Sequence, residues 1–179
     1  MAEEDVQPRF WDDLKAPATA INPPGAEADP DVSTATGLLL FDADATELCF
    51  VAMQMPHGWV QGSVIVPHVH WHKTTSAAGT VAWRLRYRYA NPGAVLSAWS
   101  DPITATDTFV SDEDTAEKHA ISTFGDVQYT DGKISMMWLF ELARVGSGDT
   151  YAADAELLEF DVHYQISQPG SGQQWRKYS

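Results

Sequence analysis

The sequence predicts an all-β protein: an antiparallel β-sandwich of the jelly-roll type that follows an extended, proline-rich N-terminal arm. Apolar runs of strand length, several with a polar residue at every second position, recur between clusters of Gly, Pro, Asn and Asp. No segment shows the period of an amphipathic helix. The 179 residues are 44% hydrophobic and include 7 Trp, 6 Tyr and 7 Phe, enough for the core of one domain. An immunoglobulin-like Greek key is the second arrangement that fits such strands.

The N-terminal part of the chain differs from the rest in being rich in Ala, Pro and Asp and in lacking any period. Proline fixes φ and has no backbone N–H, so we expect neither a helix nor a central strand there. Phe10, Trp11 and Leu14 are apolar anchors that would hold this arm along its own domain or a neighbouring subunit. A disordered tail is the alternative. The chain thus divides into an arm, a sandwich domain and a C-terminal tail, at residues 1–36, 37–168 and 169–179.

The first four predicted strands are bounded by turn residues. Met55-Pro-His-Gly58 interrupts the chain after the second strand, and Ser76-Ala-Ala-Gly79 ends the third. The fourth strand alternates Trp, Leu and Tyr on one face with Arg on the other, and it closes at Asn91-Pro-Gly93. These strands are expected at residues 37–41, 47–53, 63–73 and 80–90.

The second half of the chain repeats this pattern. Residues 97–100 are a candidate short strand, and Thr130-Asp-Gly-Lys133 is expected to be a hairpin-like turn. The last strand alternates apolar residues, beginning at Leu158, with Glu159, Asp161 and His163. The later strands are expected at residues 104–110, 118–124, 134–145 and 157–166.

The composition excludes several classes of function. The chain carries 11 basic and 25 acidic residues, a formal charge of −14, whereas a nucleic-acid-binding protein needs positive charge to replace phosphate counterions. No apolar run approaches membrane-spanning length, and the acidic start Met-Ala-Glu-Glu-Asp is not a secretory signal. We therefore expect a soluble protein made in a cytoplasm, with neither nucleic acid nor membrane as partner. Its single cysteine, Cys49, lies in an apolar run and is expected to be a buried, inert thiol.

The most informative motif is a row of histidines within the third predicted strand. His68, His70 and His72 occupy every second position, so a strand places all three on one face and Trp71 on the other. A packed or intersubunit face of imidazoles is the main interpretation. A metal site is the alternative, although same-face neighbours in one strand are nearly 7 Å apart, so that two of them, but not easily three, can reach one ion.

This motif also resembles the opening of the first cupin signature, G-x5-H-x-H, through Gly62, His68 and His70. Cupins place a Glu four or five residues beyond the second His, where this chain has Thr74 and Thr75, and the second cupin signature is absent. The resemblance implies a metalloenzyme with His68, His70 and the later His163 as ligands. The departures from the signature argue against it, and we expect no metal and no cofactor.

A row of arginines is the second feature of interest. Arg84, Arg86 and Arg88 share one face of the fourth predicted strand and repel one another unless carboxylates match them. Glu159 and Asp161 alternate in the same way on the last strand, and opposite charges across a sheet contribute about 0.2–1 kcal/mol per pair. A solvated face with ion pairs is the main interpretation, and a docking surface for an acidic partner or a symmetry mate is the alternative.

Further motifs of catalysis or binding are absent. The acidic segments Asp42-Ala-Asp44 and Asp112-Glu-Asp114 lack the spacing of a calcium loop and are interpreted as solvated charge runs. The chain contains no G-x-S-x-G, P-loop, H-E-x-x-H or G-x-G-x-x-G. We therefore expect no catalytic residues.

Five segments together resemble a family of small virion structural proteins of tailed bacteriophages. They are Phe10-Trp-Asp-Asp-Leu14, Gly37-Leu-Leu-Leu-Phe-Asp42, Met53-Gln-Met-Pro-His-Gly-Trp59, Gly62-Ser-Val-Ile-Val-Pro-His-Val-His-Trp71 and Leu157-Leu-Glu-Phe-Asp-Val-His-Tyr164. The likeness runs from the arm to the last strand, and it transfers no catalytic residue. It implies a β-sandwich that assembles on a phage particle.

These observations together predict a non-enzymatic virion protein, most directly a capsid decoration or cement protein. It would form a homo-oligomer, by default a trimer, assemble in the cytoplasm of a bacterial host and bind the major capsid protein or other virion proteins. Its interface would include Phe10, Trp11 and Leu14 of the arm together with the histidine row. A tail, neck or head-fibre component belongs to the same class.

Two other classes of function are alternatives. The first is a host-surface carbohydrate-binding module that stacks sugars on Trp59, Trp71 or Trp99. The second is the cupin-like metalloenzyme.

Overall fold

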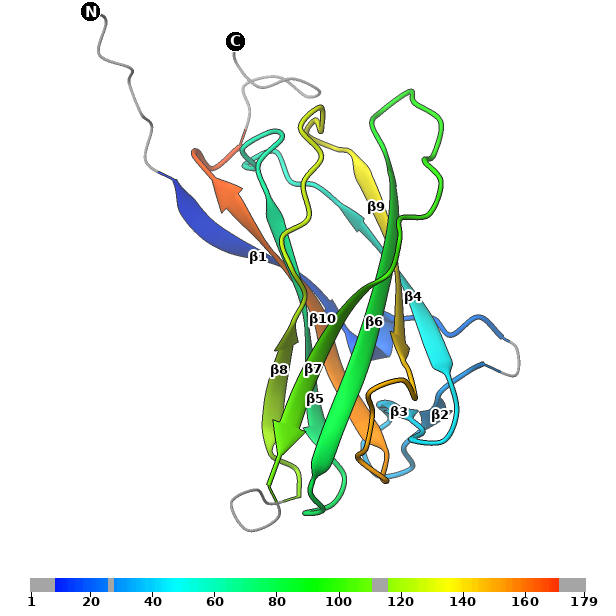
Figure 1. The fold of residues 1–179 in the computed structure, drawn as a ribbon. Helices are drawn as coiled ribbons and strands as arrows, with labels where there is room; N and C mark the ends of the chain where they lie inside the picture. Colours follow the sequence, from blue (N-terminus) through cyan, green and yellow to red (C-terminus); the bar gives the residue numbers. More distant parts are fainter. Residues whose placement is uncertain (1–8, 26–27, 111–115, 171–179) are drawn as a thin grey trace, which may run out of the picture.

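Two antiparallel sheets packed face to face make up the protein in the computed structural model, which describes residues 9–25, 28–110 and 116–170 (Figure 1). One sheet has six strands and the other has four. The strands are β1 (Phe10–Pro17), β2 (Asp31–Val32), β3 (Leu39–Phe41), β4 (Glu47–Gln54), β5 (Ile65–Lys73), β6 (Gly79–Ala90), β7 (Ile103–Phe109), β8 (His119–Thr123), β9 (Met137–Arg144) and β10 (Ala155–Ile166). Among the described residues the helical structure is one 3-10 turn, η1 (Ala18–Ala20).

The strand order is that of a jelly roll, which confirms the predicted fold class. The larger sheet contains the order β3-β10-β5-β8, and the smaller sheet has the order β4-β9-β6-β7. Counted from β3, these are strands 1-8-3-6 and 2-7-4-5. Successive strands thus alternate between sheets except at the β6–β7 hairpin, as expected for the two Greek keys of a jelly roll.

The segment predicted as an arm supplies two further strands to the larger sheet. β1 pairs with the second half of β10 in register from Phe10–Ile166 to Pro17–Glu159, and β2 pairs with β3. β1 therefore lies along its own domain. It pairs with the same edge of β10 as β3, which occupies residues 155–157 of β10, whereas β1 occupies residues 159–166. Leu14 packs against the core, whereas Phe10 and Trp11 remain 59% and 54% exposed.

The core lies between the sheets and is formed by alternate residues of the facing strands. Val69, Trp71 and Ile65 of β5 face Trp83 and Leu85 of β6 across it, and all five are almost completely buried. Cys49 lies in the same core, where burial raises the pKa of its thiol, as expected for an inert cysteine.

Two details of the strand prediction were wrong. Residues 97–100 do not form a strand; the Ser97 and Ser100 backbone N–H groups donate to carbonyls of β6, and their hydroxyls accept from the N–H groups of Tyr89 and Tyr87. The turn at 130–133 exists, but it does not close a hairpin, because it connects β8 and β9, which belong to different sheets. A turn signal marks a reversal of the chain without specifying which strands pair.

A bulge in β10 also changes which leucine is buried. The pairing of β10 with β5 shifts between Leu157 and Glu159, so Leu157 points into the core and Leu158 occupies the irregular position. Strict alternation would have placed Leu158 inside. The bulge leaves Glu156, Glu159 and Asp161 together on the outer face.

No helix among the described residues has the length and apolar character needed to cross a membrane.

Candidate functional site

The outer face of the six-stranded sheet gathers five of the six histidines of the chain. β5 lies in the middle of this face, between β10 and β8, and its three outward side chains are the histidines of the sequence motif. The sixth histidine, His57, lies elsewhere and contacts the Ser135 hydroxyl at 3.2 Å. The five are His68, His70 and His72 of β5, His119 of β8 and His163 of β10.

Carboxylates from the neighbouring strands alternate with these rings. The register of β10 against β5 places Glu156 opposite His72 and Asp161 opposite His68. The Nε2 atom of His72 lies 2.8 Å from a Glu156 carboxylate oxygen. A similar pair joins β10 to β1, since His163 of β10 lies 3.0 Å from Asp13 of β1.

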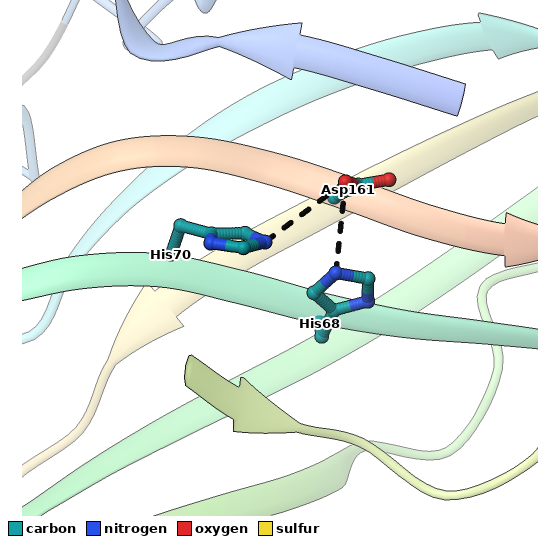
Figure 2. Close-up of side chains that lie close together, drawn as sticks. All are labelled: His68, His70 and Asp161. Atoms are coloured by element: carbon teal, nitrogen blue, oxygen red, sulfur yellow. Dashed lines mark ion pairs between the residues drawn. The ribbon is translucent and has the colours of Figure 1, made fainter. Parts of the chain in front are cut away.

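The centre of the face is a trio of His68, His70 and Asp161, shown in Figure 2. The Asp161 Oδ2 atom lies 3.6 Å from His68 Nε2 and 3.9 Å from His70 Nε2. His68 and Asp161 are nearly inaccessible to solvent, at 3% and 2% side-chain exposure, whereas His70 retains 21%. The Asp161 Oδ1 atom is buried and has no hydrogen-bond partner among the described residues.

Neighbouring rings cover this trio. The His163 ring lies 4.2 Å from that of His68, and the His119 ring stacks on that of His70 at 5.0 Å. His68 and His70 are themselves 5.0 Å apart, centroid to centroid. The histidines thus pack against one another within a single chain.

The second ring nitrogen of each histidine in the trio is also occupied. His68 Nδ1 lies 3.3 Å from the Val66 carbonyl oxygen, and His70 Nδ1 lies 2.8 Å from His119 Nε2. A carbonyl oxygen only accepts, so His68 Nδ1 carries a proton. In neutral His68 the Nε2 atom is then a bare lone pair that faces a carboxylate. This arrangement is favourable only with a cation at Nε2, either a second proton or a metal ion.

The pKa values of the three groups are shifted by burial and by their mutual charges. Burial lowers the pKa of His68, but the nearby Asp161 carboxylate and the Val66 carbonyl, which accepts from Nδ1, outweigh it and leave the pKa raised. For Asp161, burial raises the pKa, but the nearby His68 and the Val162 backbone N–H reverse this and leave the pKa lowered. Burial, then the charges of His68 and His119, lowers the pKa of His70.

The structure therefore brings together part of the predicted site and adds one residue. His68 and His70 converge as two members of one strand, while His72 points to Glu156 instead. In the metal alternative His163 was expected as the third ligand; the structure places Asp161 there and directs His163 Nε2 to Asp13. Asp161 precedes His163 by two residues on the same face, so strand alternation was the available signal for it.

The arginine row forms the outer face of the smaller sheet, and its partner differs from the predicted one. Glu141 of β9 accepts hydrogen bonds from Arg84 at 3.1 Å and from the Arg86 Nε at 2.9 Å, with a second Arg86 bond to its other oxygen at 2.5 Å. Glu159 and Asp161 lie on the other sheet. The Arg88 guanidinium lies over the Trp99 ring at 5.6 Å.

A shallow groove of about 330 Å³ lies beside this row. Phe50, Trp99, Arg88 and Asn22 contribute to its lining. Of the tryptophans considered for sugar stacking, Trp59 and Trp71 are completely buried and cannot meet a ligand. Trp99 is partly exposed.

No family model and no curated protein matches this sequence. Among solved structures, a Paenibacillus cycloisomaltooligosaccharide glucanotransferase complexed with cycloisomaltoheptaose aligns with 88% of this chain, at 12% identity and a TM-score of 0.43. An Arthrobacter globiformis isomalto-dextranase complexed with panose aligns with 84%, at 14% identity and a TM-score of 0.42. The aligned part spans 18% and 23% of those two proteins.

Two matches of similar size to this chain have lower scores. TmCBM61 in complex with β-1,4-galactotriose aligns over 88% of both chains, at 8% identity and a TM-score of 0.32. The Eiger TNF of S. frugiperda aligns over 93% of this chain and 91% of its own, at 13% identity and a TM-score of 0.31. At such identities and scores, no function is transferred from these proteins, and the jelly-roll assignment stands on the strand order itself.

Proposed function

We propose that this protein is a non-enzymatic structural subunit of a tailed-phage virion, which assembles as a symmetric oligomer and contacts its partners through strand β1. A capsid decoration protein that binds the major capsid protein is the form of this function that we favour. A tail, neck or head-fibre component is the alternative within the same class.

The observation that carries the proposal is the exposed edge at β1. This eight-residue strand pairs on one side with β10, and no described residue pairs with its other side. An open edge presents unpaired N–H and C=O groups on which another chain can add a strand. Phe10 and Trp11, at 59% and 54% exposure, add apolar area at its beginning. Aromatic residues of this kind are common anchors at protein interfaces.

The resemblance to virion proteins agrees with this placement, because one of its segments is Phe10-Trp-Asp-Asp-Leu14, which lies within β1. The three anchors differ in their exposure. Leu14 packs against the chain's own core, and Phe10 and Trp11 remain available to a partner. We therefore expect assembly to depend on the aromatic pair.

The test compares the full chain with a Phe10→Ser/Trp11→Ser double variant and with a Val95→Ser control. Val95 is 92% exposed in a loop far from β1 in sequence. Light scattering coupled to size exclusion gives the oligomeric state, and co-sedimentation with particles that lack the protein gives virion binding. We expect the double variant to lose oligomerisation or particle binding, and the control to keep both. A monomeric wild-type chain that does not bind particles would refute the proposal.

The groove beside the arginine row favours one second candidate, a carbohydrate-binding function at a host surface. Trp99 in this groove is partly exposed, and Arg88 and Asn22 supply polar groups beside it. Intrinsic fluorescence during titration with host-surface oligosaccharides tests this candidate, with Trp99→Ala as the variant. Trp59 and Trp71 are buried and cannot meet a saccharide. Trp99→Ala should therefore abolish the fluorescence response, and a response that survives in this variant would contradict binding at the groove.

A further inference from the structure

We propose that His68, His70 and Asp161 form a binding site for one divalent transition-metal ion on the outer face of the six-stranded sheet. The proposal does not depend on the virion function, because it rests on the geometry of one chain. It replaces the histidine-only ligand set of the sequence motif with two imidazoles and a carboxylate.

The spacing of the three groups fits an ion between them. For bonds of about 2.0–2.2 Å in a tetrahedral site, ligand atoms lie about 3.3–3.6 Å from one another. The Asp161 Oδ2 atom is 3.6 Å and 3.9 Å from the two Nε2 atoms, and the three ligand atoms all lie within 4.8 Å of one another. Binding therefore requires small side-chain movements and no rearrangement of the sheet.

The hydrogen bonds around the trio orient the rings as a metal site requires. A metal-bound histidine usually donates its other ring N–H to an acceptor, which fixes the tautomer. His68 Nδ1 donates to the Val66 carbonyl, and His70 Nδ1 lies within hydrogen-bond distance of His119 Nε2. With both protons on Nδ1, both Nε2 lone pairs point to Asp161, as Figure 2 shows for the rings themselves.

The carboxylate supplies an independent indication of a missing partner. Asp161 is buried among imidazoles, and its Oδ1 atom makes no hydrogen bond to any described residue. A buried carboxylate is costly unless a positive charge or donors compensate it. An ion held by Oδ2 or by both oxygens provides that charge without requiring a doubly protonated His68.

The chemistry of the donors selects the class of metal. Two imidazole nitrogens and one carboxylate oxygen suit zinc, iron(II) and related ions, whereas calcium and magnesium prefer all-oxygen sites. His72 and His163 are excluded as ligands by their own carboxylate partners, Glu156 and Asp13. We use Zn²⁺ as the probe, and Co²⁺ as a spectroscopic substitute for it.

The experiment titrates the full chain, produced without a histidine tag and stripped with a chelator, against Zn²⁺ in the presence of a competing indicator. Wild type is expected to bind one Zn²⁺ per chain. Loss of a group that merely orients a ligand weakens binding 10–100-fold, so Asp161→Asn and His70→Gln, which replace a ligand carboxylate and a ligand imidazole by neutral amides that bind Zn²⁺ poorly, should each weaken it at least tenfold. His72→Gln, on the same strand and face, should stay within about twofold of wild type.

Co²⁺ provides the second readout, because the intense visible bands of a tetrahedral site should appear in wild type and in His72→Gln but not in His70→Gln. His70 is the more exposed ligand at 21%, so His70→Gln decides the question if Asp161→Asn fails to fold. The absence of stoichiometric Zn²⁺ binding by wild type overturns the proposal. Equal weakening by His72→Gln and His70→Gln overturns it as well, since it would indicate adventitious binding by surface imidazoles.

Discussion

Arg144 allows the sharpest test of how this sandwich is held together. Its side chain is 1% exposed at the end of β9, where it forms a bidentate ion pair with Asp149 at 2.8 and 2.9 Å. The same guanidinium donates to the carbonyls of Phe41, Ala153 and Tyr151 at 2.9, 2.7 and 2.5 Å. One side chain therefore ties β3 and the β9–β10 loop to the smaller sheet.

Replacement of Arg144 by Met keeps much of the volume and removes all five of these hydrogen bonds. Asp149 is left with a side chain that is 3% exposed and has lost its cation. Breaking a buried ion pair from one side costs about 3–5 kcal/mol. A chain of this size loses about 2–4 °C per kcal/mol, so we expect a fall of about 6–20 °C in Tm.

The matched control is Arg84→Met on the neighbouring β6. Arg84 is 28% exposed, and its partner Glu141 keeps the two hydrogen bonds from Arg86. Partly exposed pairs contribute about 0–1 kcal/mol, so this variant should remain close to wild type. Urea unfolding followed by tryptophan fluorescence measures both variants. If Arg144→Met destabilised no more than Arg84→Met, the guanidinium would not be the tie that its contacts indicate.

Three further predictions follow from single sites. Lys73 is fully buried, and its ammonium has no hydrogen-bond partner among the described residues. The Phe109 and Tyr151 rings that face it offset only part of the cost of burying the charge. Lys73→Met should therefore raise the free energy of unfolding, measured by urea titration, by about 1–4 kcal/mol. Burial raises the folded-state pKa of Glu47, so its contribution to stability is complete below pH 4.5 and is lost as the pH rises through the raised value. The difference in unfolding free energy between Glu47→Gln and wild type should therefore move in favour of the variant above pH 4.5, and a difference independent of pH would contradict this. Phe10→Ser/Trp11→Ser should leave the free energy of unfolding of the monomer in urea nearly unchanged, within about 0.5 kcal/mol per site, because both rings are exposed; a larger loss would show that they support the fold itself.

The strands could be predicted from the sequence because the period of two is a local property. In β6, Trp83 and Leu85 are buried while Arg84 and Arg86 point outward, as alternation requires. The same rule placed the β5 histidines on one face. It also indicates that Trp71, on the opposite face from the histidines, lies in the core, which conflicts with a sugar-stacking role for that residue.

Strand pairing could not be predicted in the same way, because it joins residues far apart in the chain. The carboxylate that meets the arginine row is Glu141, 55 residues beyond Arg86, and not the predicted Glu159 or Asp161. Nothing local to β6 or β10 distinguishes these partners. Only the assignment of β9 to the smaller sheet and β10 to the larger one decides between them.

The position of Asp161 shows how local irregularity and long-range register combine to build the candidate site. The bulge after Leu157 lets Leu157 and Phe160 both face the core, although they are an odd number of residues apart. As a result Glu156 faces outward before the bulge and Asp161 after it, each opposite a different β5 histidine. A strand without the bulge would lose one of these two pairings.

The two outer faces of the sandwich balance their carboxylates by different means. The smaller sheet uses arginines, whose charge is permanent, to hold Glu141. The larger sheet sets Asp161 and Glu156 against imidazoles, which are positive only when they carry an added proton or hold a metal ion. In a chain with a formal charge of −14, the larger sheet therefore has a face whose charge depends on what it binds. β1 reaches this face through Asp13, which pairs with His163 beside the trio. Zn²⁺ binding at the trio and oligomerisation through β1 can therefore be measured in the same sample.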